Sequence, residues 1–149
     1  MTDLSGFSRL VPREHGLVTV STLRPDHTIQ STVVNAGVLD HPLTGAPVVG
    51  FVVRGGTRKL DYLRAQPRAT VTIRAGWEWA TAEGAVELAG PDDPQPGVDA
   101  DRLRRLLREI FTAAGGTHED WDAYDQVMAA ERRTAVLLSP DRVYSNPAR

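Results

Sequence analysis

The residues best suited to chemistry are Gly55-Gly56-Thr57-Arg58-Lys59, which follow an apolar run ending at Val53. Two glycines let the backbone approach a ligand closely, and a helix beginning here would point its free N–H groups at an anion. The Thr57 hydroxyl and the charges of Arg58 and Lys59 add donors that suit a phosphate. Lys59 is also the only lysine in the chain. The pattern predicts an anion site but names no reaction.

Basic side chains are concentrated around this turn. Residues 54–74 carry six basic side chains and a single acid, Asp61, although the net charge of the whole chain is −2. A local basic patch on a mildly acidic protein favours a discrete anionic ligand over nucleic acid, which requires a broader basic surface. The plainer alternatives are a solvated basic face and, for Thr57, a simple helix cap. We therefore expect no nucleic-acid partner.

Other familiar chemistries have no support in the sequence. The chain has no cysteine, which excludes disulfides, thiolate catalysis and cysteine-ligated metals. The four histidines lack the paired spacing of a metal site. No serine lies in a nucleophile elbow, the carboxylates are scattered, and Gly55-Gly56 lacks the spacing of a Walker or dinucleotide motif. We expect no metal, and the sequence identifies no catalytic acid or base.

Length and composition fit an ordinary globular domain. The 149 residues suit one domain, residues 1–149, and 41% hydrophobic residues are enough for a core. No apolar run approaches the roughly 18 residues that a membrane span needs. The first residues lack the basic and apolar regions of a signal peptide. We therefore expect a cytoplasmic protein with no membrane partner.

The elements that must position the turn are mostly short strands. Five segments have the apolar pattern of strands, namely residues 17–23, 29–39, 47–53, 69–74 and 77–88. The first two should form a hairpin with its turn at residues 24–27, and the fifth should be bulged near Gly84. We expect a further strand at residues 134–138, a turn at Pro140-Asp141 and a last short strand at residues 142–144.

Helical spacing marks the remaining segments. Residues 3–15 predict a short amphipathic helix, and another short helix should follow the glycine turn. Residues 103–111 carry an apolar stripe for a helix that Asp99 or Asp101 would cap, and residues 117–120 resemble a capping box for the next helix. The element order predicts a mainly β (α+β) fold, an antiparallel barrel of about six to seven strands with flanking helices. A barrel this small fills its interior, so a large ligand would bind outside it.

Three segments, taken in order, carry a further signal. They are the strand pair of residues 17–23 and 31–35, the turn and helix of residues 55–69, and the strand of residues 77–88, which ends in Glu83-Gly84-Ala85-Val86-Glu87-Leu88. Together they resemble the pyridoxamine-phosphate-oxidase-like, FMN-binding split β-barrel proteins. More narrowly, they are similar to the flavin/deazaflavin oxidoreductases that use coenzyme F420. The resemblance covers nearly the whole chain and depends on the combination, not on one motif.

This resemblance implies a homodimer with the cofactor in a groove between the subunits. The implied cofactor-binding residues are Val33, Val34, Asn35, Arg54, Gly55, Gly56, Thr57, Arg58, Lys59, Trp77 and Trp79. Residues 57–59 would hold the cofactor phosphate, and the strand at residues 33–35 would lie against the ring system. Arg54, Arg64 and Arg68 would face the oligoglutamate tail of the deazaflavin.

Two of these assignments have structural alternatives. Val33 and Val34 are ordinary residues for a core strand, and Asn35 is as well suited to satisfying a bulge as to bonding the ring. Alternation places Trp77 and Trp79 on one face of a strand, where they would serve dimer packing as well as the cofactor of the other subunit.

The function that the resemblance implies is hydride transfer from reduced coenzyme F420 to an electron-poor small-molecule acceptor. The absence of an acid–base pair is compatible with this function because the cofactor carries the reactive carbon. One alternative keeps the fold but uses FMN for oxidase or reductase chemistry. The other is a non-catalytic protein that binds a cofactor, haem or another tetrapyrrole.

Overall fold

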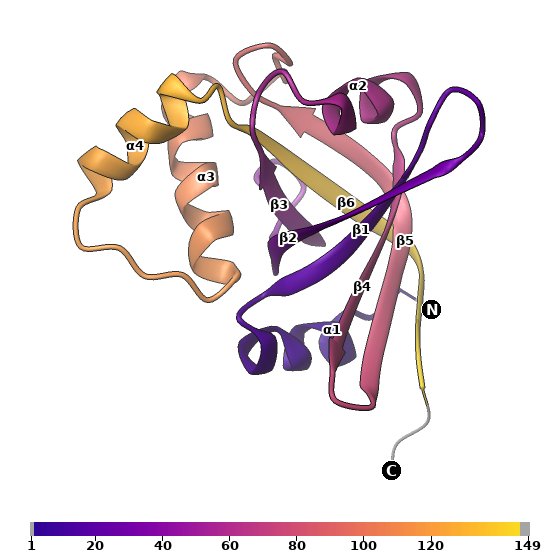
Figure 1. Ribbon diagram of the computed structural model, residues 1–149. Helices are drawn as coiled ribbons and strands as arrows, with labels where there is room; N and C mark the ends of the chain where they lie inside the picture. The colour runs from indigo at the N-terminus through magenta and orange to yellow at the C-terminus, as the bar shows by residue number, and fades with distance from the viewer. Residues whose placement is uncertain (1, 147–149) are drawn as a thin grey trace.

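The computed structural model describes residues 2–146 and shows a closed antiparallel barrel of six strands (Figure 1). Around the barrel, the strands follow the order β1-β2-β3-β6-β5-β4. Their bounds are β1 Leu17–Leu23, β2 Ile29–Asp40, β3 Pro47–Val53, β4 Arg68–Ala75, β5 Glu78–Ala89 and β6 Thr134–Ser145. The mainly β, antiparallel barrel predicted from the sequence is confirmed.

Within residues 2–146, four α-helices and a short 3-10 helix flank the barrel. They are α1 Ser5–Leu10, the 3-10 helix η1 Val11–Glu14, α2 Arg58–Ala65, α3 Ala100–Ala113 and α4 Trp121–Ala130. α3 packs across β2, β3 and β6, and α4 lies beside α3 on the side away from the barrel (Figure 1). α2 and α1 lie at opposite ends of the barrel. Within residues 2–146, every helix is too short or too polar to cross a membrane.

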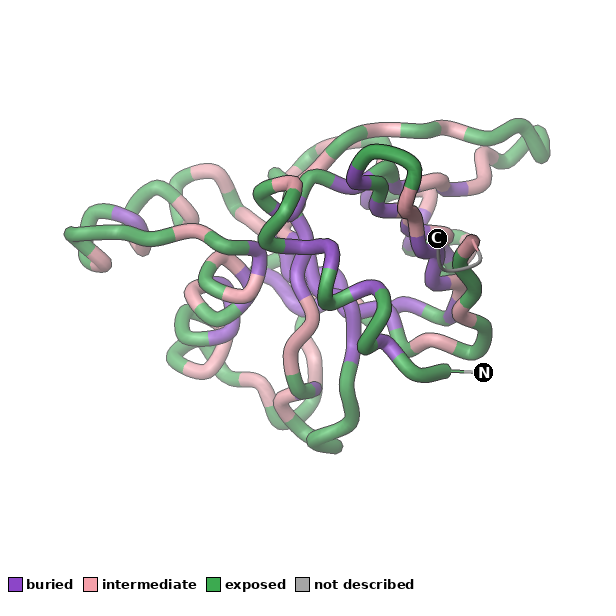
Figure 2. Tube along the Cα trace, turned by 90° about the horizontal axis from the view of Figure 1, so that it is seen from below, coloured by how far each residue is buried: buried purple, intermediate pink, exposed green. Residues whose placement is uncertain are grey.

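The fold has two apolar cores, one inside the barrel and one outside it. The inner core includes Val20, Phe51 and Ile73, which alternation along their strands points inward. The outer core lies where α3 covers the barrel and includes Leu106 and Ile110. Figure 2 shows the buried positions gathered in the interior, with exposed residues on the peripheral loops and helix faces. Because side chains fill the barrel, a large ligand must bind outside it.

The end of the chain differs from the sequence prediction. Residues 134–145 form one continuous strand, so the turn predicted at Pro140-Asp141 is wrong. Gly84 pairs with Pro140 and Glu83 with Arg142, which leaves Asp141 as the extra residue of a β-bulge. Proline is tolerated at a bulge because its missing N–H costs no ladder bond there. A bulge lies opposite Gly84 as predicted, but its extra residue is on β6 and not on the fifth strand, where it was predicted. A Cβ on Gly84 would lie only 2.0 Å from the carbonyl oxygen of Ser139.

Two helix starts also differ from the sequence prediction. The predicted helix at residues 3–15 is shorter and tightens into η1, where Pro12 stands in the first turn. The capping box predicted at residues 117–120 is wrong in its first residue: Asp120, not Thr117, caps α4 by accepting a hydrogen bond from the N–H of Ala123 at 3.1 Å. For α3, Asp99 is the cap, at 2.7 Å from the N–H of Arg102.

Candidate functional site

The glycine turn connects β3 to α2, and each glycine meets a different steric demand. The N–H of Gly55 donates to the carbonyl oxygen of Glu131 at 3.0 Å, and a Cβ on Gly55 would lie 2.6 Å from the carbonyl oxygen of Arg132. Gly56 has a φ of +78°, in the left-handed region that favours glycine. The turn is therefore held against residues 131–132 and delivers the chain to α2 in one defined direction.

At the start of α2, two polar side chains are withdrawn from water without a partner. Thr57 occupies the cap position, but its hydroxyl makes no capping hydrogen bond, and its Oγ1 atom is buried with no hydrogen-bond partner. Lys59 is half-buried, and this burial lowers the pKa of its ammonium group because the charged form loses hydration. No carboxylate pairs with Lys59 within residues 2–146. The first N–H groups of a helix also lack intrahelical partners, so this corner offers several donors to an anion.

Three of the six basic residues around the turn are already engaged within the chain. Arg64 donates two hydrogen bonds to Asp93, at 2.8 and 2.7 Å, which raises the pKa of its guanidinium group. Arg68 pairs with Asp141 at 2.8 Å, and Arg74 donates to the carbonyl oxygen of Gly76. In the described part of the chain, Arg54, Arg58 and Lys59 form no ion pair. The uncompensated positive charge of this basic segment therefore gathers at the glycine turn.

The predicted ring-binding segment of β2, residues 33–35, lies beside the end of β3. The ladder between the two strands ends where Ala36 pairs with Phe51. Val33 points outward and is 66% exposed, whereas Val34 packs against the inner core. The side-chain amide of Asn35 donates to the carbonyl oxygen of His15 at 2.8 Å, so it ties β2 to the segment before β1. The structure thus gives Asn35 a definite local partner.

The two tryptophans do not both lie on one face of a strand, as the sequence predicted. Trp77 lies in the turn between β4 and β5, outside both strands, and is 79% exposed. Trp79 lies in β5, where its ring meets Tyr144 edge to face at a centroid distance of 6.1 Å. The prediction that both share a strand face is wrong, because Gly76 and Trp77 form the hairpin turn. This hairpin lies at the barrel end opposite α2, so a single chain does not bring the tryptophans to the glycine turn (Figure 1).

Of the cavities that the described residues form around α3 and α4, two bear on the predicted site. The first, which we call the β2–β3 cavity, has a volume of about 460 Å³ and includes Asn35, Val52 and Arg133 in its wall. It also borders Tyr124, whose hydroxyl donates to the carbonyl oxygen of Leu107 at 3.1 Å and whose pKa burial raises to about 12. Of the predicted site residues, only Asn35 lines it.

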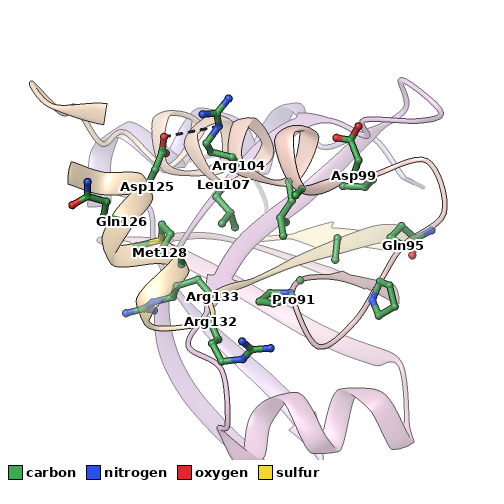
Figure 3. A pocket seen from close by; sticks show the side chains of 17 residues that line it. Pro91, Gln95, Asp99, Arg104, Leu107, Asp125, Gln126, Met128, Arg132 and Arg133 are labelled. Carbon is green, nitrogen blue, oxygen red and sulfur yellow. Dashed lines mark ion pairs between the residues drawn. The ribbon is translucent and has the colours of Figure 1, made fainter. Parts of the chain in front are cut away.

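The second cavity, which we call the α3–α4 cavity, has a volume of about 690 Å³. It is bordered by α3, α4 and the loop of residues 90–98, and none of the predicted site residues lines it (Figure 3). Sequence patterns predicted the helices but not the hollow between them. Its residues are spread over positions 89–133 and share no local spacing that would have marked them as a site.

Within residues 2–146, no group of three histidine or carboxylate side chains is arranged to hold a metal ion. The strongest chemical feature of the described chain is therefore the donor-rich corner at residues 54–59, with β2 beside it. Such a corner is able to bind and orient an anionic group, and residues 54–59 include no histidine or carboxylate that would form an acid–base pair.

No family model matches this sequence. Solved structures nevertheless share its fold, among them a pyridoxamine 5'-phosphate oxidase-related, FMN-binding protein from Nostoc punctiforme (TM-score 0.68, 14% identity, 97% of this chain and 84% of that chain). An F420 reductase is also similar (TM-score 0.61, 16% identity, 92% and 94%). A heme-binding protein from Mycobacterium smegmatis has a TM-score of 0.63 at 16% identity, over 98% of this chain and 55% of that one. The chain thus has the pyridoxamine-phosphate-oxidase-like split-barrel fold.

Proposed function

We propose that the protein is an oxidoreductase that holds the phosphate of coenzyme F420 at residues 57–59 and reduces an electron-poor organic acceptor. The observation that carries this proposal is the pair of buried or half-buried polar groups, on Thr57 and Lys59, that have no partner beside the start of α2. Groups of this kind are costly unless a ligand completes them. An F420 reductase with the same fold supports the choice of cofactor.

The chain's own residues would act by binding and orientation. Lys59 and Arg58 would neutralise the phosphate, and the first N–H groups of α2 would donate hydrogen bonds to it. Thr57 would join them after its side chain rotates toward the turn. Val33 would offer the ring an apolar strand face. The bound deazaflavin would itself supply the hydride chemistry.

We further propose that the active form is a homodimer. The outward face of the β1–β2 hairpin carries no charged side chain: it consists of Leu17, Thr19, Ser21, Leu23, Ile29, Ser31, Val33 and Asn35. Ile29 and Val33 on this face are 65% and 66% exposed. A second copy would cover these apolar side chains and bring its own Trp77 hairpin toward a groove between the subunits.

The decisive experiment is a pair of titrations of the purified protein, one with F420 and one with FMN, followed by fluorescence. Lys59→Ala should weaken binding of the preferred cofactor by about 1.5–3 kcal/mol, the value of a hydrogen bond to a charged group, or roughly 10- to 100-fold. Arg74→Ala is the matched control, because Arg74 donates to the carbonyl oxygen of Gly76 at the far end of β4 and has no assigned role in cofactor binding. An unchanged affinity in Lys59→Ala would remove the phosphate site.

FMN is the second candidate cofactor, and two observations favour keeping it. The similar protein from Nostoc punctiforme binds FMN. In addition, Arg64 and Arg68 are already paired with carboxylates, which leaves Arg54 as the unpaired member of the three residues assigned to an oligoglutamate tail. Tighter binding of FMN than of F420 would transfer the proposal to FMN chemistry.

A non-catalytic binding protein is the third candidate, since a heme-binding protein also has this fold. Turnover separates it from a reductase. A reductase should consume reduced cofactor when an acceptor is supplied, whereas a binding protein should leave the cofactor reduced throughout a broad screen of acceptors. Haem titration of the same sample identifies a binder directly.

A further inference from the structure

Apolar side chains make up most of the exposed wall of the α3–α4 cavity. Its wall includes Leu103 and Leu107 from α3, Met128 and Ala129 from α4, and Val98 and Pro91 from the loop. Figure 3 shows Leu107, Met128 and Pro91 around the same hollow from these three elements. A volume of about 690 Å³ lies within the range of roughly 300–1,000 Å³ that is usual for small-molecule sites.

The loop that closes this cavity is held in place by ion pairs at two adjacent residues. Asp93 accepts two hydrogen bonds from Arg64 of α2, at 2.8 and 2.7 Å. Asp92 pairs with Arg132, whose Nε lies 3.1 Å from the carboxylate. Isolated backbone bridges join Gly90 to Asp93 and Gln95 to Val98. The wall is therefore organised before any ligand arrives, which lowers the entropy cost of binding.

The charged side chains around the cavity already have partners inside the chain. Arg133 pairs with Glu131 at 2.9 Å, and Arg132 with Asp92. Asp125 accepts a hydrogen bond from Arg108 at 2.9 Å and lies 4.0 Å from Arg104, as the dashed line in Figure 3 marks. A charged ligand would have to break one of these pairs or leave its own charge uncompensated.

Two neutral side chains at the edge of the cavity remain available. The amides of Gln95 and Gln126 make no hydrogen bond to any other residue in the described part of the chain, and both line the cavity. Figure 3 places them at opposite ends of the hollow, with both amides directed away from its centre. Rotation about their side-chain bonds would bring these amides to uncharged polar groups at the ends of an otherwise apolar molecule.

We propose that the α3–α4 cavity is a binding site for an uncharged, predominantly apolar small molecule with a neutral hydrogen-bonding group at its end. This site is separate from the turn at residues 54–59 and from residues 33–35, because none of them lines it. Its occupant therefore does not depend on the identity of the phosphate-bearing cofactor.

The test uses the full chain without added cofactor and two fluorescent probes. Nile red is neutral and apolar, whereas 1-anilinonaphthalene-8-sulfonate is anionic. We expect Nile red to bind saturably and at least tenfold more tightly than the sulfonate. Absence of saturable Nile red binding would overturn the proposal, and equal affinity for the sulfonate would overturn the assignment to uncharged ligands.

Two matched variants place the probe. Ala129 and Ala130 are both exposed on α4, but only Ala129 lines the cavity. Ala129→Phe should weaken Nile red binding at least tenfold, while Ala130→Phe should leave it unchanged. Circular dichroism and thermal unfolding check that both variants fold. A second cavity variant, Leu103→Gln, keeps the side-chain size but removes apolar surface, and it should also weaken Nile red binding. Unchanged Nile red binding in both cavity variants would overturn the proposed location.

Discussion

Thr57 and Lys59 hold polar groups in a state that is unfavourable for the free protein. The Thr57 hydroxyl is buried without a hydrogen bond, and the Lys59 ammonium group has lost part of its hydration without gaining a carboxylate. Each group destabilises the fold unless another molecule completes it. Substitutions that remove either polar group should therefore stabilise the free protein and weaken binding of the ligand.

Thr57→Val replaces the hydroxyl by a methyl group of similar shape. Because it removes an unpaired buried polar group, it should stabilise the free protein by about 1 kcal/mol, measured by denaturant unfolding. Because it also removes a ligand donor, it should weaken binding of the phosphate-bearing cofactor. Thr32→Val is the control, since Thr32 Oγ1 is also buried without a partner but lies outside the turn. Thr32→Val should stabilise the protein and leave its affinity for the cofactor unchanged. If Thr57→Val also left this affinity unchanged, the assignment of Thr57 to the phosphate site would be contradicted.

The sequence predicted the residue types at the turn but not their bonding. Glycines, a hydroxyl and two cations are readable as a string, and they suggested an anion site. The Thr57 hydroxyl does not cap α2, and this depends on its side-chain torsion. That Asn35 bonds to the carbonyl oxygen of His15 depends on the left-handed residue at position 15, where φ is 54°. Such contacts are set by neighbours in space.

At the scale of elements, the β5–β6 bulge fixes how the two longest paired strands of the barrel fit together. Gly84 faces the backbone of Ser139 and Pro140 so closely that no side chain fits between them. The extra residue, Asp141, lets the ladder resume on the other side of the bulge. Local sequence showed a proline followed by a polar residue, which is equally typical of a turn, so the continuous strand could be recognised only from its pairing with β5.

Gly84→Ala should therefore destabilise the protein by about 1–3 kcal/mol, the usual cost of forcing an extra carbon into a packed site. The free energy of unfolding in denaturant is the measurement. Gly6→Ala provides the contrast, because nothing lies within 4 Å of a Cβ at Gly6 in α1. Alanine favours the helix there, and this variant should be more stable by about 0.5–1 kcal/mol. If Gly84→Ala were as stable as the unaltered protein, β5 and β6 would be able to move apart at this point without a loss of stability, and the prediction would be wrong.

The packing of α4 on α3 includes a carboxylate held between arginines. Asp125 accepts a hydrogen bond from Arg108 and lies near Arg104, and both effects lower the pKa of its carboxyl group below 3.8. Because the folded pKa is lower than the unfolded one, this pair stabilises the fold above pH 3.8 and ceases to do so as the pH falls through the folded pKa.

Asp125→Asn should consequently reduce the thermal unfolding temperature at neutral pH and have a diminishing effect as the solution is acidified. Asp122→Asn serves as the control, since Asp122 is exposed on the same helix and forms no ion pair within residues 2–146. Its difference from the unaltered protein should stay small at every pH. A constant difference for Asp125→Asn between neutral and strongly acidic solution would contradict this account.

At the scale of the whole molecule, the proposed homodimer depends on the uncharged outer face of the β1–β2 hairpin, where Ile29 and Val33 are exposed. Val33→Glu would place a charge in its centre and should shift the proposed homodimer to monomers in sedimentation velocity. Val127→Glu, at a residue 50% exposed on α4, adds the same charge elsewhere and should leave the dimer intact. A monomeric unaltered protein would refute the dimer itself.

Most of the architecture could be predicted from the sequence because it follows from short-range patterns. Apolar patterns predicted β1 and β3 with their observed bounds, β3 from a continuous apolar run, and the apolar stripe of residues 103–111 predicted α3. The α3–α4 cavity could not be predicted in this way. It exists because α4 and the loop of residues 90–98 stand apart on either side of α3, and no local pattern encodes an unfilled space.

The strand that closes the barrel is β6, which pairs with β3 through residues 134–138 and with β5 through residues 135–145. It is also synthesised after the other five strands. A nascent chain therefore carries two unpaired strand edges, on β3 and on β5, until β6 has left the ribosome. Such edges readily pair with another chain. The period of greatest aggregation risk for this protein thus falls during translation and ends only when its last strand inserts.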